Sequence, residues 1–308
     1  MRLRLGNDGR WAYVLANLSA FLWSTNVILG RMLREDIGPF GIAAGRFAVA
    51  SLVYLVILFK APVEQRRPGG QWRTLLLMGL TGVFGFSVLL YLGLRYTTAA
   101  NGALITGISP MLIGLAAAIF LGERFTARHA IGGIISLIGV AILVSNGSIA
   151  ALLGASFNLG DLIILIAYVL WALYTVLGRM STRHRSALST TAISTWMGLP
   201  LLLVGAVMEW RVTPPRLTPF VVGSIVYIGV FAAAIAMLAW HEAIRRGKPA
   251  EVSAMYNFLP VYGVLMGVLV VGESLSTGQL IGGALVLLGG TVTISSELRR
   301  RPARNSPA

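Results

Sequence analysis

The chain is a succession of apolar runs about twenty residues long, each followed by a short polar turn. Ten such runs lie at residues 11–33, 39–60, 72–94, 98–121, 127–146, 159–181, 188–208, 219–242, 248–271 and 277–297. About twenty apolar residues in an α-helix cross the roughly 30 Å hydrocarbon core of a bilayer. A membrane β-barrel would instead show ten-residue segments of alternating hydrophobicity. The runs therefore predict an all-α integral membrane protein with ten transmembrane helices.

The composition agrees with a lipid environment. Of the 308 residues, 56% are hydrophobic and 12% are charged, and the mean hydropathy is +0.79. A water-soluble domain of this length needs more charge to cover its surface. The net charge of +14 could suggest nucleic acid, but the basic residues are scattered over six segments and do not gather on one face. We therefore expect a lipid bilayer as partner and no nucleic acid.

Two parts of the chain repeat each other. Residues 91–145 align without a gap on residues 241–295 at an offset of 150, and residues 22–32 match residues 170–180 at an offset of 148. The paired positions include Arg95 and Arg245, Ala100 and Ala250, Pro110 and Pro260, Leu115 and Leu265, Leu137 and Leu287, Gly139 and Gly289, and Trp23 and Trp171. The predicted units are residues 11–146 and 159–297, followed by a basic cytoplasmic tail at 298–308.

The second unit is predicted to be inverted relative to the first. Each unit contains five helices, an odd number, so the second enters the membrane from the opposite side. With the N-terminus in the cytoplasm, 19 of the 25 basic residues fall in cytoplasmic segments and five in outer connections. This bias follows the positive-inside rule and predicts that both termini are cytoplasmic. An inverted repeat supplies one state open to each side, although an old duplication without a transport role is the alternative.

The ordered motifs resemble those of the drug/metabolite transporter superfamily, in its EamA-type branch. The motifs are the Trp23 and Trp171 helices, Arg46-Phe47, Leu121-Gly122-Glu123 with Val271-Gly272-Glu273, and Gly132-Gly133 with Gly282-Gly283. The resemblance covers residues 11 to 297. It implies a ten-helix exporter of amino acids or similar small metabolites in a bacterial inner membrane. Within that branch the chain looks most similar to aromatic amino-acid and paraquat exporters.

Two prolines are predicted to act as hinges. Pro110 and Pro260 lie in the middle of the fourth and ninth helices, and each removes a backbone hydrogen bond to the residue four positions earlier. The freed carbonyls, of Thr106 and Tyr256, need a partner or a wet cavity inside a membrane. An inert kink is the alternative. The polar neighbours that we expect beside a central binding site are Thr106, Ser109, Tyr256 and Asn257.

The first and sixth helices carry further candidates for binding a substrate. Trp23 and Asn26 share a helix face, as do Trp171 and Tyr174, because each pair is three residues apart. An indole beside an amide or phenol suits a small amphipathic or aromatic solute, whereas interfacial anchoring is the alternative. Tyr91 and Trp240 are weaker candidates near the ends of the third and eighth helices.

Small residues predict close packing in four helices. Small side chains in the third and eighth helices allow the close approach of a neighbouring helix, or leave room for a cavity. These residues are Gly79, Gly82, Gly85, Ala232, Ala233, Ala234 and Ala236. The fifth and tenth helices carry Gly132, Gly133, Ser136 and Gly139, and Gly278, Gly282, Gly283 and Gly289. We interpret this last set as a packing seam.

Charged residues in or near the apolar runs are few. Arg46 could bind a substrate carboxylate, but we favour a structural role in which it reaches the outer interface. Glu123 and Glu273 are predicted to cap the helices that follow them. His241 and Glu242 are predicted to join an interfacial ion pair with arginines, with a proton relay as the alternative.

The sequence predicts a secondary active exporter with a small-molecule substrate, no cofactor and no metal. An uncoupled facilitator of the same fold is the alternative, since no acidic residue is evident in the middle of a helix. An enzyme is disfavoured because Arg245 stands where a zinc-protease motif needs its second histidine, and cysteine is absent from the sequence. A primary pump is disfavoured by the lack of a phosphate-binding loop. We expect a monomer.

Overall fold

The computed structural model describes residues 5–59, 61–97, 99–148, 150, 158–266 and 276–298. Helices account for nearly all of these residues, and the described part of the chain contains no β-strand. The first repeat consists of α1 (Leu5–Met32), α2 (Pro39–Leu58), the α4–η2–α5 rod (Trp72–Met78, Gly79–Phe86, Ser87–Tyr96), α6 (Ala99–Leu121) and α7 (Ala127–Val144). Two short helices, α3 (Val63–Arg66) and η1 (Gly69–Gln71), connect α2 to α4.

The second repeat has the same order of elements. It consists of α9 (Leu159–Ser181), α10 (Ala187–Val212), the α11–η3–α12 rod (Pro219–Tyr227, Ile228–Ile235, Ala236–Arg246), the α13–η4–α14 rod (Pro249–Val252, Ser253–Asn257, Phe258–Met266) and α15 (Thr277–Leu298). Within the described residues, eight helices or rods are long and apolar enough to cross a membrane, and α15 provides a shorter apolar helix. The prediction of an all-α membrane protein with two repeats is confirmed.

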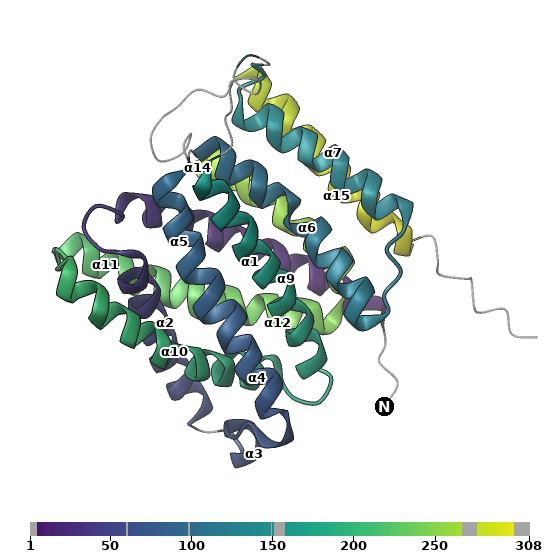
Figure 1. Cartoon of the computed structure of the whole chain (residues 1–308). Helices are drawn as coiled ribbons and strands as arrows, with labels where there is room; N and C mark the ends of the chain where they lie inside the picture. Colours follow the sequence, from purple (N-terminus) through teal and green to yellow (C-terminus); the bar gives the residue numbers. More distant parts are fainter. Residues whose placement is uncertain are drawn as a thin grey trace, which may run out of the picture.

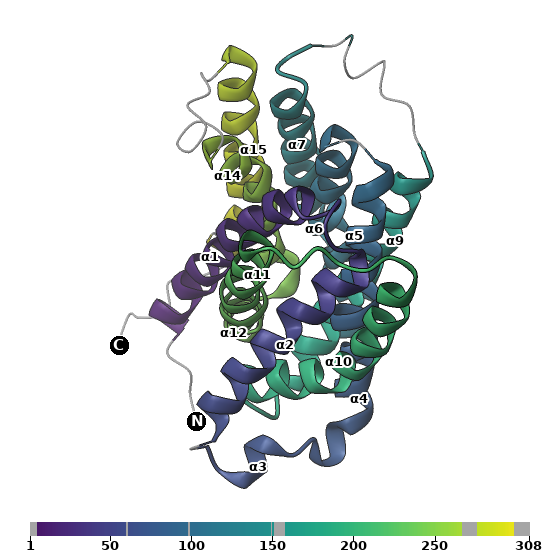
Figure 2. The same ribbon diagram turned by 90° about the vertical axis from the view of Figure 1, so that its left-hand side faces the viewer.

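The packing of the helices has the pseudo-two-fold pattern of an inverted repeat. The helix α1 packs on α12 and α14 of the second repeat, and its counterpart α9 packs on α5 and α6 of the first repeat. The equivalent helices α2 and α10 contact each other, as do α7 and α15. Figures 1 and 2 show α7 and α15 side by side at one edge of the bundle. We call the end of the bundle where α1 begins and α15 ends the terminal end, and the opposite end the distal end.

The third and eighth membrane rods each contain a π-helical segment, η2 and η3, at equivalent positions. A π-helical turn is wider than an α-helical turn and often marks a functional site. Side chains bond to the backbone there: the Tyr54 hydroxyl lies 3.0 and 2.9 Å from the carbonyl oxygens of Ala233 and Ala234. These small alanines let α2 approach the backbone of η3, as the sequence predicted.

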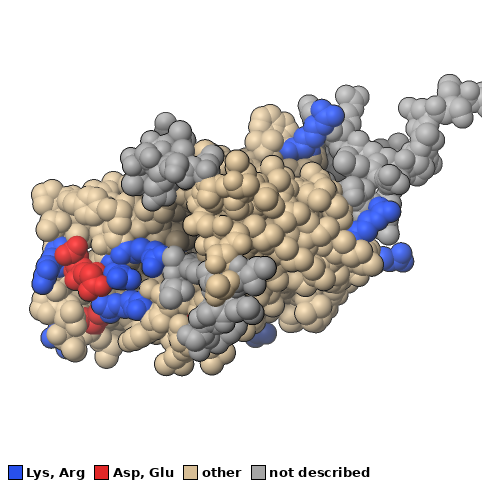
Figure 3. Space-filling model, turned by 90° about the horizontal axis from the view of Figure 1, so that it is seen from above, with Lys and Arg blue, Asp and Glu red and all other residues tan. Residues whose placement is uncertain are grey.

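The surface separates charge from apolar area. Lys and Arg side chains gather toward two ends of the face in Figure 3, and an area without them lies between. Large apolar side chains are exposed on many helices, including Val56 (74%), Ile119 (69%) and Met208 (64%). Such exposure would be unfavourable in water but suits contact with lipid chains.

Glu123 connects the two repeats at the terminal end. The prediction that Glu123 caps α7 is wrong, because α7 is capped by Thr126, whose hydroxyl lies 2.8 Å from Nδ1 of His129. The Glu123 carboxylate instead faces the backbone N–H of Ala250, at 3.5 Å, in the first turn of α13. Burial raises the pKa of the Glu123 carboxyl, because desolvation outweighs that N–H and the nearby cations. Glu273 lies outside the described residues.

Candidate functional site

Aromatic rings from both repeats meet near the middle of the bundle. The indole of Trp23 in α1 lies edge-on against that of Trp171 in α9, with ring centroids 5.1 Å apart. Trp240 of α12 and Tyr256 of η4 pack on these two indoles at centroid distances between 5.5 and 6.1 Å. Edge-to-face and tilted ring pairs contribute about 0.5–1.5 kcal/mol beyond the area they bury. The rings therefore form a rigid apolar wall.

Two of these indoles are fixed by hydrogen bonds. Trp23 donates from Nε1 to the carbonyl oxygen of Ala232 in η3 at 3.0 Å, and Trp240 donates to the Thr175 hydroxyl at 3.2 Å. Trp171 is 2% exposed, and its Nε1 has no hydrogen-bond partner among the described residues. A buried donor without a partner is rare in folded proteins. The wall thus offers one free donor.

Arg46 lies in a cluster of neutral side chains beside this wall. Its guanidinium donates to Oδ1 of Asn26 at 3.3 Å and to the Ser87 hydroxyl at 2.7 Å, and Tyr91 donates to the same Asn26 oxygen at 2.7 Å. The guanidinium carbon lies 4.7 Å from the ring centroid of Phe47. Arg46 is 4% exposed. The expectation that it reaches the outer interface is therefore wrong, because α2 directs it into the bundle.

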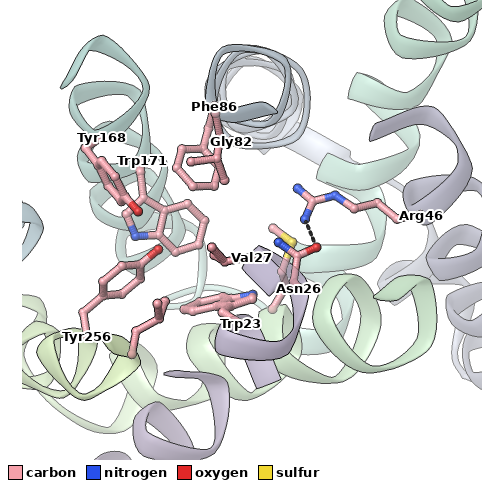
Figure 4. A pocket seen from close by; sticks show the side chains of 12 residues that line it. Trp23, Asn26, Val27, Arg46, Gly82, Phe86, Tyr168, Trp171 and Tyr256 are labelled. Atoms are coloured by element: carbon pink, nitrogen blue, oxygen red, sulfur yellow. Dashed lines mark hydrogen bonds between the residues drawn. The ribbon is translucent and has the colours of Figure 1, made fainter. Parts of the chain in front are cut away.

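A small cavity lies between the rings and Arg46. Its volume is about 20 Å³, which is room for about one water molecule. In Figure 4 the rings gather on one side of this cavity and Arg46 enters from the other side. The lining residues are Trp23, Asn26, Val27, Arg46, Gly82, Phe86, Leu90, Tyr168, Trp171, Met237, Tyr256 and Leu259. We call it the central cavity.

A much larger space, the vestibule, adjoins the central cavity toward the distal end. Its volume is about 380 Å³, within the range of small-molecule sites. It reaches from Thr106 and Pro260 in the middle of the bundle to Arg31 and Gln279 near the distal helix ends. Four side chains line both spaces and separate them: Val27, Leu90, Tyr168 and Leu259. A solute entering from the distal end would therefore meet these four side chains before it meets Arg46.

A third cavity occupies the equivalent place on the terminal side, and it is closed. Its volume is about 10 Å³. Three of its lining residues, Pro110, His129 and Thr293, correspond at the offset of 150 to Pro260, Gln279 and Leu143 of the vestibule. Three corresponding positions of the two repeats therefore line a large space toward the distal end and a small one toward the terminal end.

The predicted site residues fall into five groups. Trp23, Asn26, Trp171 and Tyr256 line the central cavity, and Thr106 and Pro260 line the vestibule. Tyr91, Tyr174 and Trp240 pack behind the central cavity. Pro110 and Asn257 line the closed cavity instead. Ser109 is fully buried and lines none of these spaces, and its hydroxyl has no partner among the described residues.

Several residues of the central cavity were not predicted from the sequence. Tyr168 lies three residues before Trp171, so helical spacing alone could have placed both on one face. Its hydroxyl lies 2.7 Å from that of Thr106 and joins α9 to α6. Phe86, whose ring centroid is 4.9 Å from that of Trp171, carried no signal of this kind. Gly82 does more than thin its helix: a Cβ atom there would lie 2.2 Å from the Tyr174 ring.

The expected ion pair at the end of α12 forms, but without His241. Glu242 pairs with Arg245 and with Arg246, the latter at 2.6 Å, which confirms that part of the prediction. The prediction is wrong for His241, which is fully buried, with Nδ1 2.9 Å from the hydroxyl of Thr191. The helical step of about 100° per residue turns His241 toward α10 while Glu242 faces outward.

The chain is similar to known proteins over its whole membrane-spanning part. The sequence model of the EamA-like transporter family matches residues 10–145 and residues 158–295. The uncharacterized transporter YyaM of Bacillus subtilis (strain 168) is 33% identical over 270 residues, which cover 87% of this chain and 88% of that protein. A probable terminal-alkyne amino-acid exporter of Streptantibioticus cattleyicolor is 26% identical over 300 residues, covering 96% of this chain and 97% of that protein.

The fold is also known from crystallography. One crystal structure superposes on this chain with a TM-score of 0.77 at 22% sequence identity, and the match covers 94% of this chain and 99% of that one. At this identity the likeness concerns the fold alone.

Proposed function

Because the chain belongs to the EamA-like transporter family, we propose that it is a secondary active exporter of amino acids or similar small metabolites. The chain is a multi-pass membrane transporter of small molecules and not an enzyme. We propose the direction of transport, the class of solute and the mechanism. The mechanism is alternating access, in which the two inverted halves rock about the central cavity.

The observation that carries this proposal is the pair of equivalent cavities. Alternating access needs one binding site that is open in turn to each side of the membrane. The vestibule and the closed cavity share three corresponding lining positions, and their volumes are about 380 and 10 Å³. This difference is the one expected of a transporter open at its distal end. In the opposite state the two volumes would be exchanged, with Pro110 and Pro260 as the hinges.

The proposed solute follows from the wall of the site and from a relative. The rings of Trp23, Trp171 and Tyr256 suit a solute with an apolar or aromatic body. The Streptantibioticus relative is named a probable amino-acid exporter. Amino acids, aromatic ones first, are therefore the solutes to test.

The proposed orientation rests on the distribution of charge. The positive-inside rule assigns the terminal end, with its excess of arginine and lysine, to the cytoplasm of a bacterial cell. The vestibule would then open to the outside of the inner membrane. The two repeats, residues 11–146 and 159–297, would be the rocking units of a monomer, with residues 298–308 as a cytoplasmic tail.

An uncoupled facilitator is the second candidate, and one observation favours it. Among the described residues, neither the central cavity nor the vestibule is lined by aspartate, glutamate or histidine. Proton-coupled transporters commonly use such side chains as relays. The two candidates differ in their response to a pH gradient.

We expect Trp171→Ala to reduce the flux of labelled amino acids in proteoliposomes at least about tenfold. The substitution removes several ring contacts, each worth about 0.5–1.5 kcal/mol, and 1.4 kcal/mol corresponds to a factor of ten. Flux would be measured with and without a pH gradient. Flux that follows the gradient supports secondary active export, and flux indifferent to it supports the facilitator.

Trp72→Ala is the matched control. Trp72 is 48% exposed at the start of α4 and lines none of the three cavities. We expect its flux to equal that of the wild type. Equal flux in Trp171→Ala would show that the central cavity is not the transport site, and no flux of any amino acid in the wild type would refute the proposed solute class.

A further inference from the structure

We propose that the solute is an organic anion, and that Arg46 binds its carboxylate once the four side chains between the vestibule and the central cavity move aside, while the aromatic wall holds its apolar body. This inference rests on the proposed function, because it keeps transport through the central cavity, and within the class of small metabolites it favours an organic anion over an amino acid. Such an anion carries a carboxylate but no amino group, and in this it differs from a zwitterionic amino acid.

The charge of Arg46 is not neutralised within the protein. Its hydrogen-bond partners, Asn26 and Ser87, are neutral, and among the described residues no carboxylate oxygen lies within 4.0 Å of it. An arginine in the middle of a membrane protein is costly unless it meets an anion or water, and it usually marks a binding site. A guanidinium stays charged in proteins. A bound carboxylate would supply the missing countercharge.

The unoccupied hydrogen-bonding groups at the site are donors. Nε of Arg46 and Nε1 of Trp171 are buried and have no partner among the described residues. Both residues line the central cavity, from opposite sides (Figure 4). A ligand carboxylate would satisfy the Arg46 donor, whereas a ligand that brings further donors would leave it unpaired; the nitrogen of Trp171 lies on the side of its ring away from Arg46 (Figure 4). Buried donors without partners cost free energy, so the site favours an acceptor.

The described lining of the site offers an ammonium ion no carboxylate partner. In the described part of the chain, the linings of the central cavity and the vestibule contain no aspartate or glutamate. The charged groups there are arginines, Arg46 in the cavity and Arg31 in the vestibule. An amino group would be repelled by both, and like charges in a site of low dielectric repel strongly. The geometry therefore favours a net negative solute over a zwitterion or a cation.

Three probes of one skeleton test this inference. We would measure the equilibrium binding of three ligands to the purified full-length protein at pH 7. 3-Phenylpropionate is an anion, L-phenylalanine is a zwitterion and 2-phenylethylamine is a cation. We expect 3-phenylpropionate to bind at least about tenfold more tightly than L-phenylalanine, since each 1.4 kcal/mol changes an affinity tenfold. We expect no binding of the amine.

Asn26→Asp tests the role of Arg46 without removing it. The substitution keeps the shape of the side chain and places a carboxylate where Oδ1 already accepts from Arg46 at 3.3 Å. The internal ion pair would compete with the ligand, so we expect binding of 3-phenylpropionate to weaken at least about tenfold. The folded protein should keep its thermal stability, because the new pair neutralises a buried charge.

Asn17→Asp is the matched control on the same helix. Asn17 faces the Met255 sulfur at 3.4 Å and lines none of the three cavities. We expect it to leave binding of 3-phenylpropionate unchanged. Equal binding of the zwitterion and the anion, or unchanged binding in Asn26→Asp, would overturn the inference, as would failure of all three probes to bind.

The two proposals fail in different ways. If 3-phenylpropionate binds and Asn26→Asp weakens it, but no solute crosses a liposome membrane, the inference stands and the transport mechanism fails. If amino acids are transported at equal rates by the wild type and by Asn26→Asp, export stands and the inference fails.

Discussion

Gly282→Leu should prevent the stable assembly of the fold. In α15 a Cβ atom at Gly282 would lie 2.4 Å from the backbone nitrogen of Leu143 and 2.7 Å from the carbonyl oxygen of Gly139, both in α7. Backbone atoms cannot move aside as the end of a side chain can, so the two helices would have to separate. Overpacking typically costs about 1–3 kcal/mol, and separating two helices along their length should exceed about 3 kcal/mol. Thermal unfolding of the detergent-purified protein would show the loss.

Gly283, the residue after Gly282, provides the control. A Cβ atom at Gly283 would have no other atom within 4 Å. Gly283→Leu makes the same chemical change in the same helix, with the same loss of glycine flexibility, and should leave the melting temperature nearly unchanged. If both variants melt alike, the contact between α7 and α15 is not a close-packed seam.

The sequence predicted this seam in part: Gly132, Gly139, Gly282 and Gly289 lie in it, whereas the prediction is wrong for Gly283, which has no neighbour within 4 Å of its Cβ position, and for Gly133, which faces Met111. Glycines four and seven residues apart in an apolar helix lie on one face, so the close approach of two such helices follows from the spacing of their glycines. In the structure Gly132 meets Gly289, and Gly139 meets Gly282. The positions of the helices were also predictable, because the length of an apolar run is set by the thickness of the bilayer, but their ends were not: α1 begins at Leu5 and not at residue 11, and α10 ends at Val212 and not at residue 208.

The central cavity was harder to predict, because its residues come from helices far apart in the sequence. Helical spacing placed Trp23 beside Asn26, but it gave no direction for Arg46, which could reach the interface or the bundle interior. The direction depends on how α2 rotates against α1 and α5, where Asn26 and Ser87 receive the guanidinium. That rotation is a property of tertiary packing.

Glu123 was misassigned for a related reason. Its position in a turn before α7 suggested a local cap, since caps are formed by residues close in sequence. The structure directs it to Ala250, the first turn of a helix in the other repeat. Local rules cannot distinguish a cap on the next helix from a contact across the repeats.

The state of the transporter is a second property that no local pattern could supply. Three lining positions of the two cavities correspond in the repeats, and nothing in their sequence says which cavity is the larger one. The structure opens the one at the distal end. Whether that end faces outward depends on the topology inferred from the arginines, and one labelling experiment tests both points together.

Ala103→Cys should react with a membrane-impermeant maleimide in intact cells, and Ala117→Cys should not. The sequence has no native cysteine, so each introduced thiol is unique. Ala103 lines the vestibule, whereas Ala117, in the same helix α6, is fully buried. The offset of fourteen residues corresponds to about 21 Å along the helix. Because a thiol reacts only where the reagent reaches it, we expect at least about a tenfold difference in labelling rate.

The same pair in inverted membrane vesicles separates orientation from conformation. If the vestibule opens outward, Ala103→Cys is labelled quickly in cells and slowly in inverted vesicles. The reverse result would place the termini outside, contrary to the positive-inside assignment. Equal slow labelling from both sides would mean that the distal vestibule is closed in the membrane.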